Sequence, residues 1–213
     1  RLLERATQLS DAQGGGSLTA LHIIETQAQD ISAYIPTNLI SITDGQIYLS
    51  PNLFHKGILP AISIGKSVSR VGGKTQFPAF RTVAGDLRLA YSQFEELETF
   101  ARFATRLDPE TRATIEHGRR VREVLKQNEH QPLRASEQMI ILKAVNAGLL
   151  DDVNLDQVGQ AETLILHRVG GRQPAFCERL DAGEALLATQ WQQVLDMAAE
   201  VLDLNKNSLS KRH

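Results

Sequence analysis

The chain has 213 residues, of which 42% are hydrophobic and 23% are charged, so it is long enough to bury a core in one or two domains. Its formal net charge of −2 excludes a general attraction to nucleic acid or to an anionic membrane surface, and we expect membrane association only through partners. The single cysteine, Cys177, excludes an intrachain disulfide and fits a reducing compartment, where we expect it to act as a small buried hydrophobe.

The first 75 residues predict the end of an α/β domain. A helix is expected over residues 1–11, and short β-branched runs between Gly, Asn, Asp and Pro predict strands. These strands are expected at residues 18–25, 40–43, 47–49 and 61–69. Asp44-Gly45 stands between two apolar runs, which is a hairpin-turn signal. Because these runs are only the end of an α/β sheet, we predict an open sheet edge and exposed apolar surface here.

The run from Pro60 to Gly73 is the most informative segment. Ile62, Ile64 and Val68 are expected to be buried in a strand, and the glycine pair after Arg70 lets that strand stop abruptly. A guanidinium presented at such an end is planar, forked and permanently charged, so two of its donors can meet two phosphate oxygens.

After residue 75 the apolar spacing becomes helical, and we expect an all-helical bundle. One stripe runs from Phe80 to Tyr91 and another from Leu97 to Ala104. Asp108-Pro109 is typical of a helix start, with a helix to about residue 126. Further helices are expected over residues 136–148, 155–169 and 184–204, with a frayed tail after 206.

Charged clusters on these helices favour solvated helix faces or, for the arginine run, an interface edge. They comprise Glu95, Glu96 and Glu98, and the run Arg119, Arg120 and Arg122. No aromatic residues interleave the arginines, so no nucleic-acid site is predicted. The six histidines have no metal-ligand spacing, and no metal site is predicted. The phosphate-loop pattern G-x-x-x-x-G-K-[ST] does not occur in the sequence.

Three segments carry a resemblance to a known family: SLTALHIIETQ (residues 17–27), YIPTNLISITDGQI (34–47) and PAI…SVSRVGG (60–73). Together they resemble the alpha subunit of the F-type rotary ATP synthase, over nearly all of residues 1–125 and more loosely beyond. The resemblance implies the last part of a RecA-like nucleotide-binding domain at residues 1–75 and a C-terminal helical-bundle domain at 76–213. It also implies a C-terminal fragment whose phosphate-binding loop lies upstream and which is inactive alone.

The resemblance implies roles for three residues at a catalytic site on the neighbouring beta subunit. Arg70 matches the arginine that alpha subunits extend to the γ-phosphate of the nucleotide on beta. Ser41 matches a serine near the same phosphates. Ser67 belongs to the same strand end, where we expect it, with Ser69, to aim Arg70.

A second, non-catalytic nucleotide site is implied on alpha itself. Gln127 matches a glutamine that recognises the base, and Phe54 matches a residue lining the pocket. Leu59 and Glu129 stand where many alpha subunits have arginine and glutamine. Losing a cation and gaining a carboxylate is expected to weaken nucleotide binding, which favours a divergent, alternate-type alpha subunit.

The implied function is ATP synthesis or hydrolysis coupled to transmembrane ion transport. The implied ligands are ATP or ADP with Mg²⁺, and the implied partners are beta in an alternating hexamer, the central-stalk gamma subunit and other subunits. The complex is expected on the cytoplasmic face of the membrane. Two alternatives stay open: a subunit of a related rotary or secretion ATPase, and an inert helical adaptor with a degenerate nucleotide fold.

Overall fold

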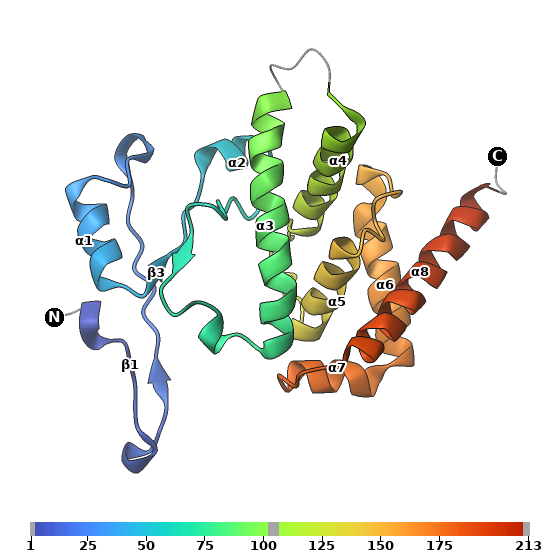
Figure 1. Cartoon of the computed structure of the whole chain (residues 1–213). Coiled ribbons are helices and arrows are strands. Elements are labelled where there is room, and N and C mark those ends of the chain that lie inside the picture. Colours follow the sequence, from blue (N-terminus) through green and yellow to red (C-terminus); the bar gives the residue numbers. More distant parts are fainter. Residues whose placement is uncertain (1–2, 102–106, 211–213) are drawn as a thin grey trace. The chain divides into compact units, whose positions relative to one another are not determined.

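A computed structural model describes residues 3–101 and 107–210, and the chain divides into two compact units, Arg1–Lys74 and Thr75–His213. Ala104, which the sequence places in a helical stripe, lies outside the described residues. Figure 1 follows the chain from one unit to the next, and each unit is described by itself below.

Unit 1 is built mostly from loops, with short helices and two small sheets (Figure 1). Its elements are a 3-10 turn Leu3–Arg5, β1 (Thr7–Gln8), a 3-10 turn Asp11–Gln13, β2 (Ser17–Leu18), a 3-10 turn Gln27–Gln29, α1 (Tyr34–Ile42), β3 (Gly45–Gln46), α2 (Pro51–His55), β4 (Val68–Ser69) and a 3-10 turn Gly72–Thr75. Both sheets are antiparallel: Thr7 pairs with Leu18 in the first, and Gly45 pairs with Ser69 in the second.

Two predictions for the start of unit 1 are wrong. The helix expected over residues 1–11 is replaced by the β1–β2 ribbon, whose turn contains Gly14, Gly15 and Gly16, all at positive φ. An isolated helix this short is marginal in water, so a glycine turn that closes the ribbon prevails. The strand expected over 18–25 ends at Leu18, because no described segment pairs with the residues after it.

The strand predicted over residues 40–43 is also wrong, because Ile40 and Ile42 lie in helix α1. Pro36 stands in the first turn of α1, where backbone N–H groups have no helical partner, so proline costs the helix little there. Gly45 is therefore not a hairpin turn between adjacent strands, since its strand partner Ser69 comes from β4.

The strand predicted over 61–69 is interrupted. Ile62 pairs with Leu49 in an isolated bridge, and a turn follows before β4, closed by the Ser67 N–H on the Ser63 carbonyl at 3.0 Å. Neither Ile62 nor Ile64 is fully buried, and Val68 is exposed, in contrast to the expectation for all three.

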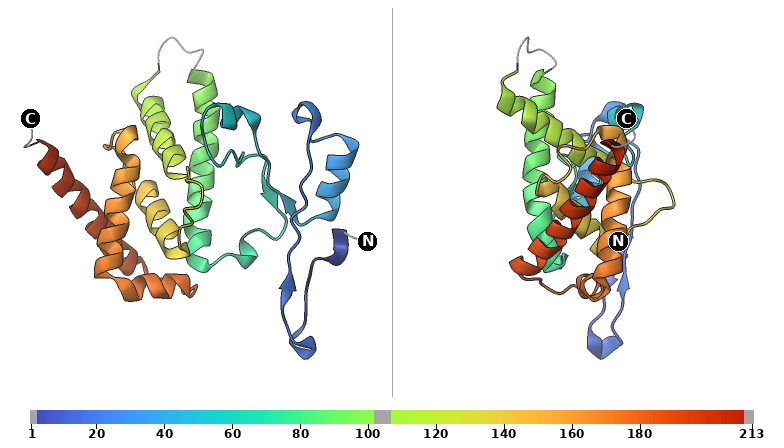
Figure 2. Two further views of the ribbon diagram at one scale, coloured as in Figure 1. Left: turned by 180° about the vertical axis from the view of Figure 1, so that it is seen from behind. Right: turned by 90° about the vertical axis from the view of Figure 1, so that its right-hand side faces the viewer.

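Unit 2 is helical, as expected (Figures 1 and 2). Its elements are α3 (Pro78–Ala101), α4 (Pro109–Val124), α5 (Ala135–Asn146), a 3-10 turn Leu155–Gln157, α6 (Val158–Arg172), α7 (Pro174–Asp181) and α8 (Ala188–Ser210). Helix α7 was not predicted, and α8 extends beyond the expected end at residue 204. Helix α3 packs on α4 and α5, and α6 packs on α8.

The core of unit 2 is apolar and closed. Its fully buried large side chains include Phe94, Met139, Ile140, Leu150, Ile165 and Leu180. Gly118 on α4 lies directly against Phe94 of α3, and a Cβ at Gly118 would overlap the phenyl ring. Close approach of α3 and α4 therefore depends on a residue without a side chain.

The charged clusters are not simply solvated faces. Arg122 on α4 makes a bidentate pair with Glu98 on α3, both N···O distances being 2.8 Å, and its guanidinium lies 4.4 Å from the Phe94 ring centroid. Only 13% of the Arg122 side chain is exposed. A forked cation can cover an aromatic ring and hold a carboxylate at once, which sequence spacing alone does not reveal.

Candidate functional site

The backbone at Arg70 and just after it is fixed by hydrogen bonds within unit 1. The Arg70 N–H donates to the Asp44 carbonyl at 2.8 Å, extending the β3–β4 pairing by one residue. The Gly72 N–H donates to the Ser69 hydroxyl at 3.1 Å, and Gly72 has φ of +62°, the left-handed region that favours glycine. The strand thus ends at a defined place with Arg70 exposed beyond it.

Glycine is needed on the opposite strand as well. A Cβ at Gly45 would overlap the Val68 carbonyl oxygen, so β3 and β4 approach more closely than a side chain there would allow. The glycine of the D-G pattern at residues 44–45 therefore allows β4 to approach β3 closely. Arg70 directly follows β4.

The Arg70 side chain reaches back to the end of helix α1. Its Nη1 donates to the Ser41 carbonyl at 2.9 Å and its Nη2 donates to the Ile40 carbonyl at 2.8 Å. The structure thus brings together two of the predicted site residues, Arg70 and Ser41. A guanidinium has five N–H donors, so these two bonds leave three available.

The Ser41 hydroxyl is exposed and donates to the carbonyl of Asn38, one turn earlier, at 2.7 Å. This is the local backbone contact common for serine in a helix. Its oxygen keeps acceptor capacity, and donation to another oxyanion requires the hydroxyl to rotate away from Asn38.

Ser67 is half-buried and engaged within the fold. Its hydroxyl donates to the Ser63 carbonyl at 2.6 Å and accepts from the Tyr48 N–H at 3.0 Å. These contacts tie the turn before β4 to the segment after β3. That Ser67, with Ser69, aims Arg70 stays a prediction.

The two residues predicted to contribute to the non-catalytic nucleotide site, Phe54 in its lining and Gln127 at the base, belong to different units. Phe54 lies on α2 in unit 1 with 62% of its surface exposed. Gln127 follows α4 in unit 2, and its Nε2 donates to the Gln131 carbonyl at 3.0 Å. Their shared role in a nucleotide site stays a prediction.

Sequence reasoning missed the acceptors of the Arg70 fork, which are the backbone carbonyls of Ile40 and Ser41. The available signal was Pro36 followed six residues later by an Ile-Thr-Asp-Gly sequence, which fits a helix ending before a turn. The β-branched composition of this run favoured a strand instead.

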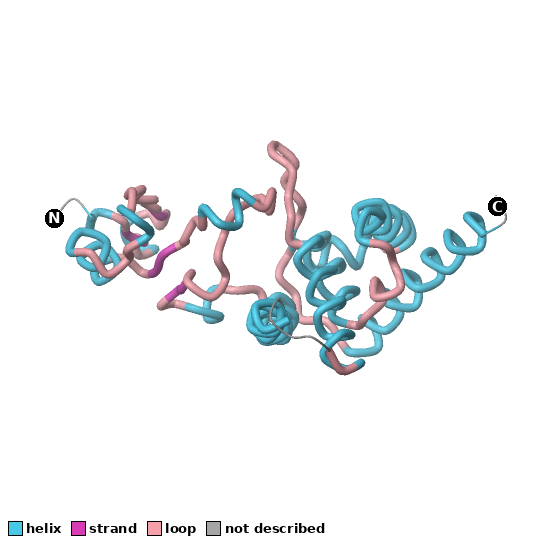
Figure 3. Tube along the Cα trace, turned by 90° about the horizontal axis from the view of Figure 1, so that it is seen from above, coloured by secondary structure: helices cyan, strands magenta, loops and turns pink. Residues whose placement is uncertain are grey.

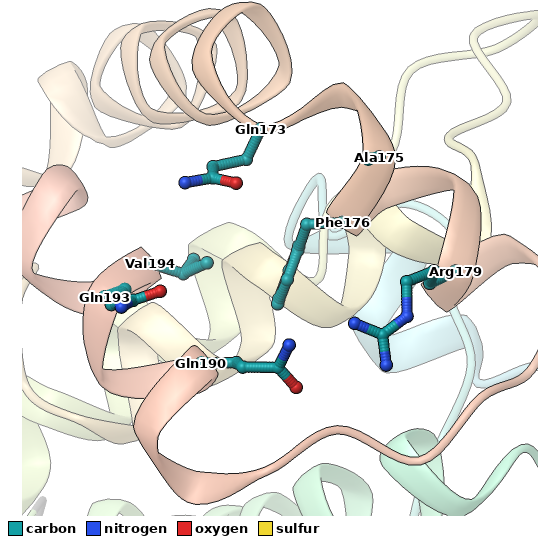
Figure 4. Close-up of a pocket in the computed structure, with 7 residues that line it drawn as sticks. All are labelled: Gln173, Ala175, Phe176, Arg179, Gln190, Gln193 and Val194. Atoms are coloured by element: carbon teal, nitrogen blue, oxygen red, sulfur yellow. The ribbon is translucent and has the colours of Figure 1, made fainter.

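A small cavity of about 140 Å³ lies between α7 and α8 (Figure 4). Figure 4 shows Phe176, Gln173, Gln190 and Arg179 around it. The Arg179 Nε is held by Glu184 at 2.6 Å, and the Phe176 ring meets Trp191 edge-on with centroids 5.6 Å apart. No sequence pattern predicts this cavity, and all the residues that line it belong to unit 2.

Of the groups in unit 2 whose pKa values are shifted, Glu162 and Cys177 have theirs raised mainly by burial. Burial, and to a lesser extent the charge of Glu123, raises the pKa of Glu162 on α6 to about 7. Its Oε1 is buried and has no hydrogen-bond partner among the described residues. Burial also raises the pKa of the Cys177 thiol, which disfavours the reactive thiolate. Cys177 is half-buried, in contrast to the buried position expected from the sequence.

Within the described ranges, no helix is long and apolar enough to cross a membrane. In the same part of the chain, no three His, Cys, Asp or Glu side chains gather into a group that could hold a metal ion.

Comparison with known proteins identifies two matching family models. The model described as "ATP synthase alpha/beta chain, C terminal domain" matches residues 76–201, and that described as "ATP synthase alpha/beta family, nucleotide-binding domain" matches residues 1–69. These matches confirm the predicted resemblance and the fold class, a portion of a nucleotide-binding domain followed by a helical C-terminal part.

Curated relatives agree. "ATP synthase subunit alpha 2" of Syntrophus aciditrophicus is 63% identical over 198 residues, covering 93% of this chain and 38% of that protein. "ATP synthase subunit alpha 1" of Shewanella frigidimarina is 68% identical over 202 residues, covering 95% of this chain and 39% of that protein. The chain thus spans about two fifths of the length of these relatives.

Proposed function

The chain belongs to the ATP synthase alpha/beta family, and on this premise we propose that it is the C-terminal part of an alpha subunit that lends Arg70 to a catalytic site on an adjacent beta subunit. There the guanidinium contacts the γ-phosphate of ATP during synthesis or hydrolysis. The reaction is coupled to transmembrane ion transport by the whole complex.

The observation that supports this proposal is the presentation of Arg70. Its backbone is fixed by the Asp44 carbonyl on one side and by the Ser69–Gly72 contact on the other, while its side chain is exposed. Three of its N–H groups are uncommitted. A cation held this way meets a phosphate with little reorganisation, which is the condition for stabilising charge that develops in a transition state.

In this proposal the catalytic phosphate loop and the water-orienting carboxylate belong to beta, while alpha supplies Arg70 and, near the same phosphates, Ser41. We assign no ligand of Mg²⁺ to this chain. Bound to the nucleotide, Mg²⁺ neutralises phosphate charge, and Arg70 adds a second, directional positive charge from the neighbouring subunit.

An arginine supplied by a neighbour makes turnover depend on closure of the alpha–beta interface. When the interface is open, the guanidinium is remote from the nucleotide and the transition state loses its stabilisation. A rotating gamma subunit that opens and closes interfaces in turn would thereby control each site. The helices of unit 2 are proposed to pack around that central stalk.

Alpha also carries a proposed non-catalytic nucleotide site, with Phe54 and Gln127 at its base-binding side. The exposed Phe54 ring offers a stacking face, and the Oε1 of Gln127 is available as an acceptor while its Nε2 is engaged with Gln131. The exposed Leu59, placed where many alpha subunits have a cation, favours weak binding there.

The test is Arg70→Ala in the full-length subunit, reconstituted with the other subunits of the complex. We expect ATP hydrolysis to fall by about 10³-fold or more, the effect of removing such an arginine in other phosphoryl-transfer systems, while assembly is retained. Arg81→Ala, which removes an exposed arginine from α3, serves as the matched control and should leave turnover within about twofold, as expected of a surface substitution.

Turnover that survives Arg70→Ala in an intact complex would contradict the proposal and favour an adaptor role. Loss of assembly in the variant would equally contradict it, because the residue would then be structural.

A further inference from the structure

Three carbonyl groups in the last turn of helix α1, those of Leu39, Ile40 and Ser41, accept hydrogen bonds. A helix leaves its final four carbonyls without intrahelical donors, and these must find partners elsewhere. In α1 the Leu39 carbonyl accepts from the N–H of Thr43 at 2.9 Å and from its hydroxyl at 2.8 Å. The next two carbonyls, of Ile40 and Ser41, accept from the Arg70 side chain. Among the described residues, Arg70 is their only donor from outside the helix.

Arg70 therefore occupies the position of a helix C-terminal cap, although it lies 29 and 30 residues further along the chain than its acceptors. The C-terminal end of a helix carries partial negative charge, which favours a cation there. Two parallel N–H···O bonds from Nη1 and Nη2 also fix the plane of the guanidinium, in the way a carboxylate does.

The helix end is itself anchored to the strand that pairs with β4. The Thr43 hydroxyl also contacts the Gly45 carbonyl at 3.1 Å, and Gly45 is the strand partner of Ser69, next to Arg70. The backbone and the side chain of Arg70 are thus both hydrogen-bonded to one short segment, which comprises the end of α1 and the start of β3.

We propose that the Ile40 and Ser41 carbonyls are a positioning cradle that holds the Arg70 guanidinium ready for a phosphate. The cradle uses two N–H donors and leaves three, so an anion can bind while the cradle stays intact. This deepens the proposed function and rests on it: the cradle supplies the orientation that an exposed arginine would otherwise lack, and its gain appears in turnover rather than in nucleotide affinity.

The experiment weakens one cradle carbonyl without changing any side chain. Replacing Ile42 by its α-hydroxy acid analogue, in the full-length subunit within the assembled complex, converts the Ser41–Ile42 amide into an ester, whose carbonyl is a poorer acceptor. The matched control places the same change at Asn38, which weakens the Thr37 carbonyl in the same helix, away from Arg70. The readouts are kcat and KM for ATP hydrolysis, complex yield and thermal midpoint.

We expect the Ile42 ester to lower kcat about 5- to 30-fold, the factor expected for losing one charge-assisted bond, with KM within about twofold of the parent. The Asn38 ester should leave kcat near the parent value. Equal kcat for the two esters, or a loss of kcat that follows the thermal midpoint in both, would overturn the cradle.

The Arg70→Ala variant distinguishes failure of the cradle proposal from failure of the proposed function. If Arg70→Ala abolishes turnover and the Ile42 ester matches its control, the arginine acts without the cradle and only this inference fails. If Arg70→Ala leaves turnover intact, the proposed function fails with it.

Discussion

The two units are stabilised by different means. Unit 2 closes an apolar core, in which Phe94, Val121 and Ile165 are fully buried. Unit 1 leaves most of its large apolar side chains in solvent, as predicted, including Ile23 at 98% and Leu21 at 82% exposure. Figure 3 shows the same contrast in the backbone, with loops prevailing in unit 1 and helices in unit 2.

This contrast shows that local order does not require a local core. The segment that holds Arg70 is defined by hydrogen bonds between named backbone groups, not by burial. Such bonds contribute about 1 kcal/mol each and are accessible to water here, so they fix a direction more effectively than they stabilise a fold. Unit 2 provides the stability, and unit 1 provides the presented side chain.

The largest effect on the free energy of unfolding should come from creating a cavity in the core of unit 2. Phe94→Ala removes a fully buried ring and is expected to lower the free energy of unfolding by about 3–5 kcal/mol. Ile23→Ala, in unit 1, should change it by less than about 0.5 kcal/mol, because the side chain is in solvent. Urea unfolding followed by the helical circular-dichroism signal measures both. Comparable losses at the two positions would break the contrast between the units.

A smaller effect should follow from filling the contact between α3 and α4. Gly118→Ala gains about 1 kcal/mol of helix propensity but forces a methyl group into the Phe94 ring, for a net loss of about 1–2 kcal/mol. Gly85→Ala on α3 meets open space and should stabilise by up to about 1 kcal/mol. Thermal unfolding should therefore move the midpoint in opposite directions for the two variants. A shift of the same sign would mean that α3 and α4 do not depend on Gly118 for their approach.

A third effect, of about the same size as that of Gly118→Ala, should depend on pH. Because burial raises the pKa of Glu162 from 4.5 to about 7, the folded state binds more protons than the unfolded state between these values. The stability of unit 2 should therefore fall as pH rises through this window. Glu162→Gln removes the ionisation and should stabilise the unit at pH 8, by on the order of 1–2 kcal/mol after allowing for solvent screening.

At pH 4.5 the same variant should be close to neutral, since the Glu162 carboxyl is then largely protonated in the fold. Glu96→Gln, which replaces a carboxyl at an exposed position on α3, is the control and should change the free energy of unfolding by less than about 0.5 kcal/mol. A pH-independent gain for Glu162→Gln would show that the carboxyl does not change ionisation on folding.

Much of unit 2 could be predicted because its signals are local. The Asp108 carboxylate accepts from the Thr111 N–H at 2.8 Å, as its place before Pro109 predicts, and Gly148 follows the end of α5 at φ of +75°. Helix α7 was missed because its eight residues show only one buried pair, Phe176 and Leu180, which is too short a pattern to recognise. Local chemistry fixes helix ends, while short helices depend on what they pack against.

Unit 1 was predicted less well for a related reason. A strand needs a partner, and the residues after Leu18 find none in the described chain, so β-branched composition was misleading there. The position of Arg70 at a strand end followed from its motif. Its acceptors did not, since they are main-chain oxygens far away in sequence, and no pattern of residue types encodes which carbonyl an arginine will meet.

The first turn of helix α5 is hydrogen-bonded to a residue that is synthesised much later than α5 itself. The N–H of Ser136, in the first turn of α5, donates at 2.8 Å to a carboxylate oxygen of Asp181, at the end of α7, 45 residues later in the chain. At a synthesis rate of about 5–20 residues per second, roughly 2 to 9 seconds separate the two on the ribosome. During synthesis the Ser136 N–H therefore lacks this acceptor for that time. The helical bundle can form completely only after its second half has left the ribosome.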